Sequence, residues 1–288
     1  MEPVQTTIPG ALAATLQARS RSLARRLLAG AGRASLVAYD LAPMVEAGAL
    51  CHGVSASGDL VVAGLRDAAV PATIWHDTPL RVRLDVVKEA PEWAVRITAC
   101  AVHLLGQLQW VPDDQVADYL LDAALPAGLI ELGSSPGGRV GIVRADRVLV
   151  HDSAGVTPLP FDAVVSRGCE AHEKGCGSFP DAEQEWAVRD VVGTLAPWQA
   201  MGLIQAAALG WTSAAMLSTR GESACPHLEG QVFCVDVDRT GLTLMAVHQG
   251  EATVVFFAFA RPVNHVDELA DRLDQLIEEG EAVRPPSR

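Results

Sequence analysis

The segment LRVRLDVVK, residues 80–88, has the most regular pattern in the chain. Leu80, Val82, Leu84 and Val86 alternate with Arg81, Arg83, Asp85 and Val87. Alternation with a period of two predicts a strand with one buried face and one polar face. A second extended stretch, residues 95–111, follows Pro91, and its internal Gly106 is typical of a barrel strand that bends sharply.

Other patterns predict short strands, with helices inserted at a few places. Helices are indicated at residues 12–29, 113–125, 182–194, 198–209 and 266–280. A strand is predicted at residues 128–132, a hairpin at 139–151 that turns at Ala145 and Asp146, and an antiparallel meander at 231–259. Strands do not alternate regularly with helices, which argues against a doubly wound parallel fold.

The charge of the chain limits the partners that it can have. The 288 residues carry a formal net charge of −13, and the one basic cluster, at residues 19–26, has the spacing of a solvated helix face. A nucleic-acid-binding protein normally presents a basic face. We therefore expect no binding to nucleic acid.

Export and membrane insertion are not expected either. The first residues, MEPVQTTIPGALAATLQARSRS, have no basic start followed by an apolar run, and the nearly uncharged stretch at residues 198–211 is too short to span a bilayer. The predicted location is the cytoplasm, where the six cysteines are expected to be free thiols.

A glycine-rich segment, RGCEAHEKGCGSFPD, contains the pattern Cys169-x2-His172-x3-Cys176. These three side chains have the chemistry of zinc ligands, and Cys225 or His227 is the obvious source of a fourth. No Cys-x2-Cys pair accompanies them, so the favoured interpretation is a linker with incidental thiols and no metal.

Two segments together resemble a known family. Residues 82–112 are similar to barrel strands of split-barrel proteins related to pyridoxamine-phosphate oxidase. CVDVDRTGLTLMAV, followed by VVFFAFARPVNHVDELADRLDQLIEEG, resembles the C-terminal domain that accompanies such barrels in HugZ-type haem-utilisation proteins and in the plant glutamyl-tRNA reductase-binding protein.

The resemblance implies an α+β protein in which an antiparallel split β-barrel precedes a smaller α+β domain. The barrel domain is expected at residues 1–168, a linker at 169–180 and the α+β domain at 181–288. It also implies a homodimer, because split barrels of this superfamily complete their clefts across a twofold interface. In HugZ-type proteins, haem lies in a cleft near that interface.

The resemblance offers haem as cofactor, with FMN or a deazaflavin as the alternative. HugZ-type proteins ligate haem through a histidine in a C-terminal loop, and the tail AVRPPSR has none. His248, in a turn, and His265, at a helix start, are the candidate ligands, whereas His103 lies in an apolar strand and is interpreted as a packed, hydrogen-bonded residue. For a flavin phosphate, the clustered basic candidates are Arg81, Arg83 and Lys88.

Three functions follow as hypotheses. The first is haem binding or haem handling, including degradation of haem for iron utilisation. The second is a non-catalytic regulatory protein that binds a partner enzyme of tetrapyrrole metabolism, since a binding module needs no ligand histidine and an acidic surface suits a basic partner. The third is a flavin- or deazaflavin-dependent oxidoreductase.

Overall fold

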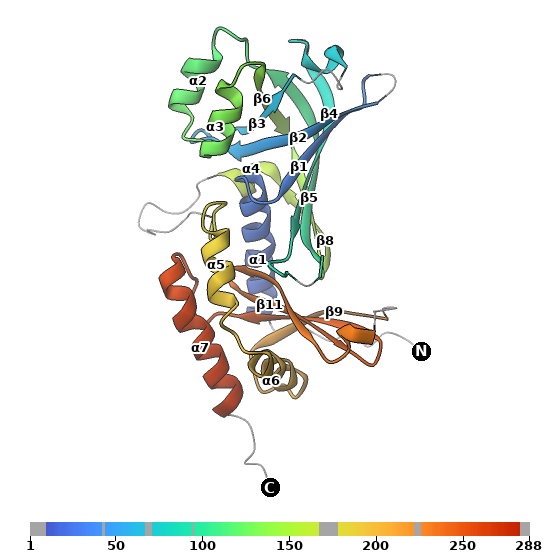
Figure 1. Ribbon diagram of the computed structural model, residues 1–288, viewed down its shortest axis with the longest axis vertical. Helices are drawn as coiled ribbons and strands as arrows, with labels where there is room; N and C mark the ends of the chain where they lie inside the picture. Colours follow the sequence, from blue (N-terminus) through green and yellow to red (C-terminus); the bar gives the residue numbers. More distant parts are fainter. Residues whose placement is uncertain are drawn as a thin grey trace. The chain divides into compact units, whose positions relative to one another are not determined.

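The computed structural model describes residues 10–41, 44–66, 71–93, 95–166, 178–221 and 226–282 (Figure 1). Contacts between residues divide the chain into two units. One runs from Leu23 to Glu185, and the other combines the start of the chain up to Ser22 with Trp186 onward. The prediction from the sequence instead groups the start of the chain with the barrel. Residues 169–177 of the predicted linker lie outside the described residues.

The unit that begins at Leu23 is built on an antiparallel barrel. Its strands are β1 (Arg33–Ala38), β2 (Val45–Val54), β3 (Leu60–Leu65), β4 (Leu80–Glu89), β5 (Thr98–Trp110), β6 (Gly138–Ala145), β7 (Arg147–Asp152) and β8 (Gly155–Pro160). The order β4-β1-β2-β3-β6-β5 is closed by pairing between β4 and β5, which makes a six-stranded barrel. The predicted split-barrel, α+β fold class is confirmed.

The alternation of the 80–88 segment is the reason that β4 can form a barrel wall. Leu80, Val82, Leu84 and Val86 are at most 7% exposed, and the side chains between them face outward. Burying a Leu or Val side chain contributes about 1.5–3 kcal/mol, so the four together stabilise this strand in one orientation. A shift of one residue would turn the arginines inward.

The long strand β5 joins the barrel to two further strands. One edge pairs with β4 along most of its length, while the other edge pairs with β6 at residues 106–110 and with β7 at residues 100–103. β8 then pairs with β7. The sheet therefore extends beyond the closed barrel, and the outer faces of β4, β5 and β7 form one surface.

Two local predictions are wrong. β6 and β7 do not form a hairpin with each other, because both run antiparallel to β5 and follow one another along its edge. Residues 128–132 are not a strand but part of helix α3 (Ala127–Ser134), which buries Leu129 and Gly133. A short apolar run is compatible with a buried strand and with a buried helix, so its pattern does not distinguish them. Pro126, directly before α3, favours the start of a helix at this point.

The other elements of this unit cover the barrel and its ends. They are the second part of α1 (Gly10–Leu28), the 3-10 turn η1 (Ala72–Trp75), α2 (Val116–Asp122), α3 and α4 (Phe161–Val165). α3 packs against β2, β3 and β6 and buries an apolar cluster around Val61, Leu129 and Val140.

Acidification is expected to destabilise the protein through His52. His52 on β2 is 3% exposed, and its Nε2 donates a hydrogen bond to the carbonyl oxygen of Leu27 at 2.5 Å. Burial lowers the pKa of His52, because the charged ring loses its hydration, and the bond to Leu27 opposes this only in part. The stabilisation from the neutral ring is therefore present above the unfolded pKa of about 6.5 and is lost as the pH falls through the lower, folded value.

Urea unfolding at several pH values between about 7.5 and 5.5 tests this prediction. The free energy of unfolding of the native chain should fall, with up to about 1.4 kcal/mol per pH unit coming from this one group. His52→Gln keeps a donor to Leu27 and cannot be protonated, so its slope should be shallower. Equal slopes in both proteins would refute the assignment to His52.

The second unit contains a four-stranded antiparallel sheet and helices. The strand order is β10 (Val232–Asp238), β11 (Gly241–His248), β12 (Glu251–Ala258) and β9 (Ala214–Gly221), so the predicted meander is present. The helices are the first part of α1, α5 (Glu185–Val192), α6 (Pro197–Ala208) and α7 (Val266–Ala282), and a 3-10 turn, η2 (Pro226–Leu228), precedes β10. α6 packs on β10, β11 and α7.

None of the described helices combines the length and the apolar character needed to cross a membrane.

Candidate functional site

The three basic residues predicted to hold a flavin phosphate do not lie together. Arg81 and Arg83 extend from the outer face of β4, and Arg81 forms an ion pair with Asp40, in which Nε donates to Oδ1 at 2.6 Å. Lys88 is 6% exposed on the opposite face, with its Nζ 3.1 Å from Oε2 of Glu185. Residues an odd number apart along a strand face opposite sides, so Lys88 cannot join the two arginines.

The two predicted histidine ligands lie at opposite ends of β11. His248 is the last residue of that strand, exposed, with Nδ1 3.0 Å from Oε1 of Glu229. Glu229 also accepts the backbone N–H of Gln249, which lowers its pKa. His265 is exposed just before α7, near Val263, whose N–H bonds to Arg239 in the turn before β11. The structure does not bring these two imidazoles together.

The predicted metal candidates Cys169, His172, Cys176 and Cys225 lie outside the described residues. Within the described ranges there is no group of three or more histidine, cysteine, aspartate or glutamate side chains suited to hold a metal ion. His227 is described, in η2, and the backbone carbonyl of His227 accepts a bond from Gln231.

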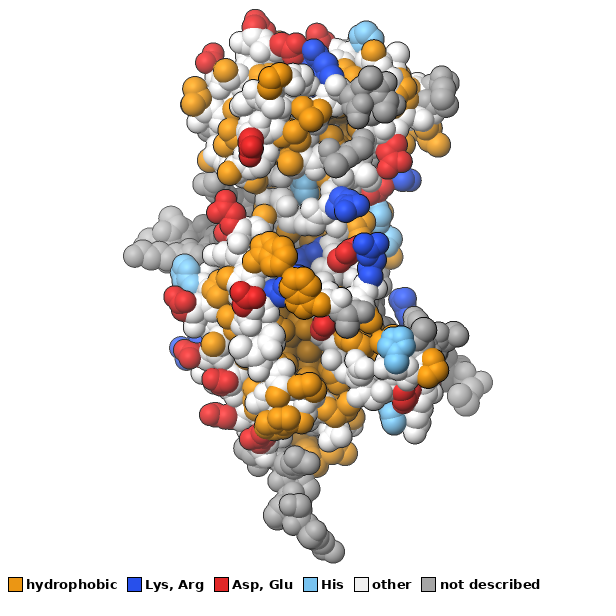
Figure 2. All heavy atoms as spheres, in the orientation of Figure 1, with side chains coloured by type: hydrophobic (Ala, Val, Ile, Leu, Met, Phe, Trp, Pro, Cys, Tyr) orange, Lys and Arg blue, Asp and Glu red, His pale blue; other side chains and the backbone are white. Residues whose placement is uncertain are grey.

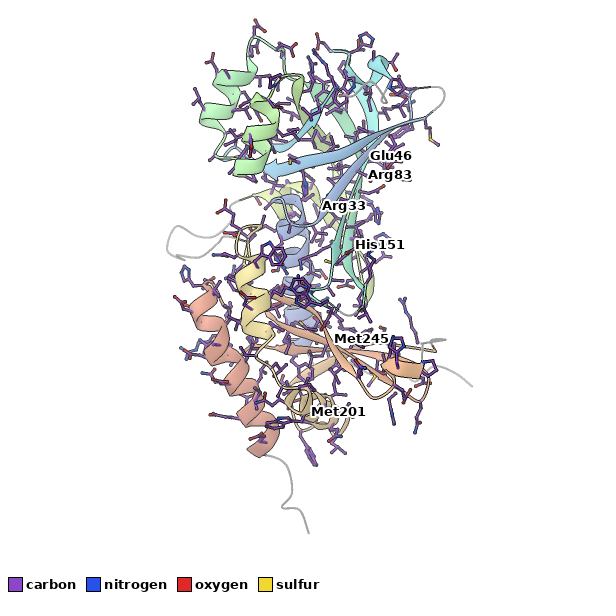
Figure 3. The ribbon with its side chains drawn as sticks, viewed as in Figure 1. Arg33, Glu46, Arg83, His151, Met201 and Met245 are labelled. Carbon is purple, nitrogen blue, oxygen red and sulfur yellow. The ribbon has the colours of Figure 1, made fainter. Side chains whose placement is uncertain are left out.

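A polar cluster that the sequence did not reveal lies on the outer face of the barrel sheet. Asp85 of β4 and His103 of β5 are register partners, and Nδ1 of His103 lies 2.6 Å from Oδ1 of Asp85. The other oxygen of Asp85 accepts Nε–H of Arg83 at 2.8 Å. The ring of His151 on β7 meets that of His103 edge-on, with 4.6 Å between centroids. Figure 3 shows Arg83 and His151 on the same side of the barrel sheet.

Apolar side chains surround this cluster on the same face. Leu105 is 64% exposed, Val156 57% and Leu149 38%. Leu105 is the register partner of Arg83, Leu149 that of His103, and Val156 that of His151. An imidazole is therefore set in a surface that combines exposed apolar groups with one arginine, and such a patch is typical of a binding face.

The contact with Asp85 determines what His103 can do chemically. A carboxylate only accepts, so Nδ1 of His103 donates to Asp85, and the neutral form of the ring has its lone pair on Nε2. A carboxylate behind an imidazole fixes the tautomer and the ring direction, as it does for metal-bound histidines. The His103 side chain is 35% exposed, which leaves room for a ligand.

His103 is hydrogen-bonded, as predicted, but it is not packed away in the core. Its position is odd-numbered in a strand whose even-numbered neighbours Val102 and Leu104 are buried, and this parity was the available signal. The sequence cannot show that Asp85 and His151 lie beside it, because those contacts depend on how three strands pair.

No protein-family model matches the chain, and no curated protein matches it. Among solved structures, a haem-binding protein from Mycobacterium smegmatis matches with a TM-score of 0.47 and 14% identity, over 96% of this chain and 100% of its own. A protein of unknown function from Agrobacterium tumefaciens matches with a TM-score of 0.38 and 16% identity, over 96% and 99%. An FAD- and haem-binding protein from M. smegmatis matches with a TM-score of 0.31 and 18% identity, over 48% and 82%. With scores below 0.5, these are distant likenesses, and what those proteins bind is a property of those proteins.

Proposed function

We propose that the protein binds haem on the outer face of β4, β5 and β7, with His103 as the iron ligand. The observation that carries this proposal is the Asp85–His103 pair, 2.6 Å apart on an accessible, partly apolar surface. A haem iron needs one accessible imidazole beside apolar groups, and the porphyrin needs cationic groups for its carboxylates. When bound, haem supplies a redox-active iron.

The residues of this face fit that group. Nε2 of His103 is the donor, Asp85 holds the ring, and Leu105, Leu149 and Val156 offer the apolar contact. Arg83 has a side chain that is 53% exposed, and only its Nε is used for Asp85, so its terminal nitrogens can bind a propionate. His151 lies against His103 and positions it from the other side.

A homodimer is part of the proposal. Leu105, Val156 and Leu149 leave apolar side chains in water on the outer face of the barrel sheet, and a second copy packed there would cover them. Such a cover would also turn an open face into a slot with two walls, which excludes water from the iron. Haem utilisation, the role that the resemblance to HugZ-type proteins implies, is also part of the proposal.

A hemin titration of the purified full-length chain tests the function. We expect a Soret band that shifts and saturates at one haem per chain. Analytical ultracentrifugation should give the sedimentation coefficient of a dimer. FMN, added in parallel, should show no saturable binding, since Arg81, Arg83 and Lys88 do not form one phosphate site. A hemin titration without saturation would refute haem binding.

A further inference from the structure

A groove runs between α6 and α7 in the second unit. Its larger hollow has a volume of about 330 Å³ and is lined by Trp198, Leu203, Trp211, Ile277 and Gly280, among others. A smaller hollow of about 180 Å³ shares Gln199 and Ile277 with it and continues toward Ala270. In Figure 2 apolar side chains gather in the lower part of the molecule, over α6 and α7. From residue 270 to residue 281, α7 rises by about 16 Å.

The rim of this groove keeps large apolar side chains in water. Trp198 is 63% exposed and Leu209 is 58% exposed. A small molecule in the hollow would leave these rim groups uncovered, whereas a protein segment laid along the groove would bury them. Tryptophan is among the residues that contribute most to protein interfaces when a partner covers it.

Among the described residues, the charged groups that line the groove are all acidic. Glu281 lines the larger hollow and Asp274 the smaller one, and no described lysine or arginine belongs to either lining. The two carboxylates are seven residues apart on α7, so they lie on one face, about 10.5 Å from each other along the axis. A net charge of −13 for the whole chain adds to this field. An anion such as a haem propionate is disfavoured here, and a cationic partner is favoured.

We propose that the groove between α6 and α7 docks a basic amphipathic helix of a partner protein. The apolar stripe of that helix would lie on Ile277 and Leu209 and beneath the Trp198 indole, with lysines or arginines two turns apart facing Asp274 and Glu281. Binding of an amphipathic helix in an apolar groove is an established mode of protein recognition. The apolar side chains that enter the groove recur every three or four residues along such a helix. The groove and the histidine face of the barrel have no residue in common.

The test uses the full-length protein and labelled synthetic peptides of about 18 residues, a length at which helices become stable. The first peptide has leucines on one face and lysines on the other. The second has the same composition in scrambled order, and the third has glutamate in place of lysine. Fluorescence anisotropy should show saturable binding of the first peptide at one per chain, with at least about tenfold weaker binding of the other two.

Variants locate the site. Trp198→Ala should weaken binding about tenfold, and Glu281→Lys by about threefold to tenfold. The matched control is Glu279→Lys, which makes the same charge change at an exposed position about 160° around the helix from Glu281. Equal losses in both lysine variants would mean general attraction to an acidic protein and would overturn the proposal. Equal binding of the scrambled peptide, or tighter binding of the glutamate peptide, would overturn it as well.

Discussion

Replacing His103 by alanine is expected to weaken hemin binding by more than about 100-fold and to remove the saturating Soret band. The reason is that Nε2 of His103 is the proposed iron ligand, and loss of even a supporting group costs metal sites about 10- to 100-fold in affinity. The measurement is the hemin titration proposed above, with circular dichroism to show that the barrel remains folded. His248→Ala and His265→Ala remove the same group elsewhere and should titrate like the native chain. A native Soret band in His103→Ala would exclude His103 as the ligand.

Asp85→Asn tests the role of Asp85 separately from that of His103, the proposed iron ligand. Asparagine keeps the shape of Asp85 but loses the charge that fixes the proton on Nδ1 of His103, so the ring becomes a weaker donor to iron. We expect hemin affinity to fall by about 10- to 100-fold while a Soret band persists at high hemin concentration. An unchanged affinity would mean that the pair is structural only.

Trp110→Ala is expected to lower the free energy of unfolding of the barrel unit by about 3–5 kcal/mol. Trp110 ends β5, is 1% exposed, and its Nε1 donates to the carbonyl oxygen of Ile74 at 2.7 Å. Its ring lies 5.0 Å from that of Trp75, and across the strands its register partner is Gly141, where a Cβ would collide with the indole. Removal leaves a large cavity and a buried carbonyl without its donor, and the packed barrel cannot collapse around them.

Chemical denaturation followed by circular dichroism measures this loss. The matched control is Trp198→Ala, the same substitution at a side chain that is 63% exposed, which should change the free energy by no more than about 0.5 kcal/mol. A loss below about 1 kcal/mol for Trp110→Ala would show that the site relaxes around the cavity.

Much of the fold could be predicted because its signals are local. The alternation of Leu80 to Val87 identifies β4 and its buried face, and the turns around Arg239 and Gln249 delimit the meander of the second unit. Local signals fail where a segment has no clear period, as at residues 128–132, and where strand direction depends on a third strand, as for β6 and β7.

The candidate site could be predicted much less well. His248 and His265 are predicted as ligands because a turn residue and a residue at a helix start could reach a groove between subunits, but the structure places the two residues apart. Lys88 and Arg83 are close in sequence and on opposite faces. The Asp85–His103–His151 cluster joins residues that are 18 and then 48 positions apart, so no spacing in the chain indicates it.

The sequence by itself determined which side chains of β4 are buried and which meet solvent, because that choice depends on a period of two and on the free energy of apolar burial. Only the tertiary structure decided that Asp85 lies opposite His103 and that His151 lies beside it. Backbone hydrogen bonds join any two strands equally well in many registers, and the packing of the whole barrel selects one of them. The position of a chemical group on a face is therefore a local property of the chain, and its neighbours on that face are a property of the fold.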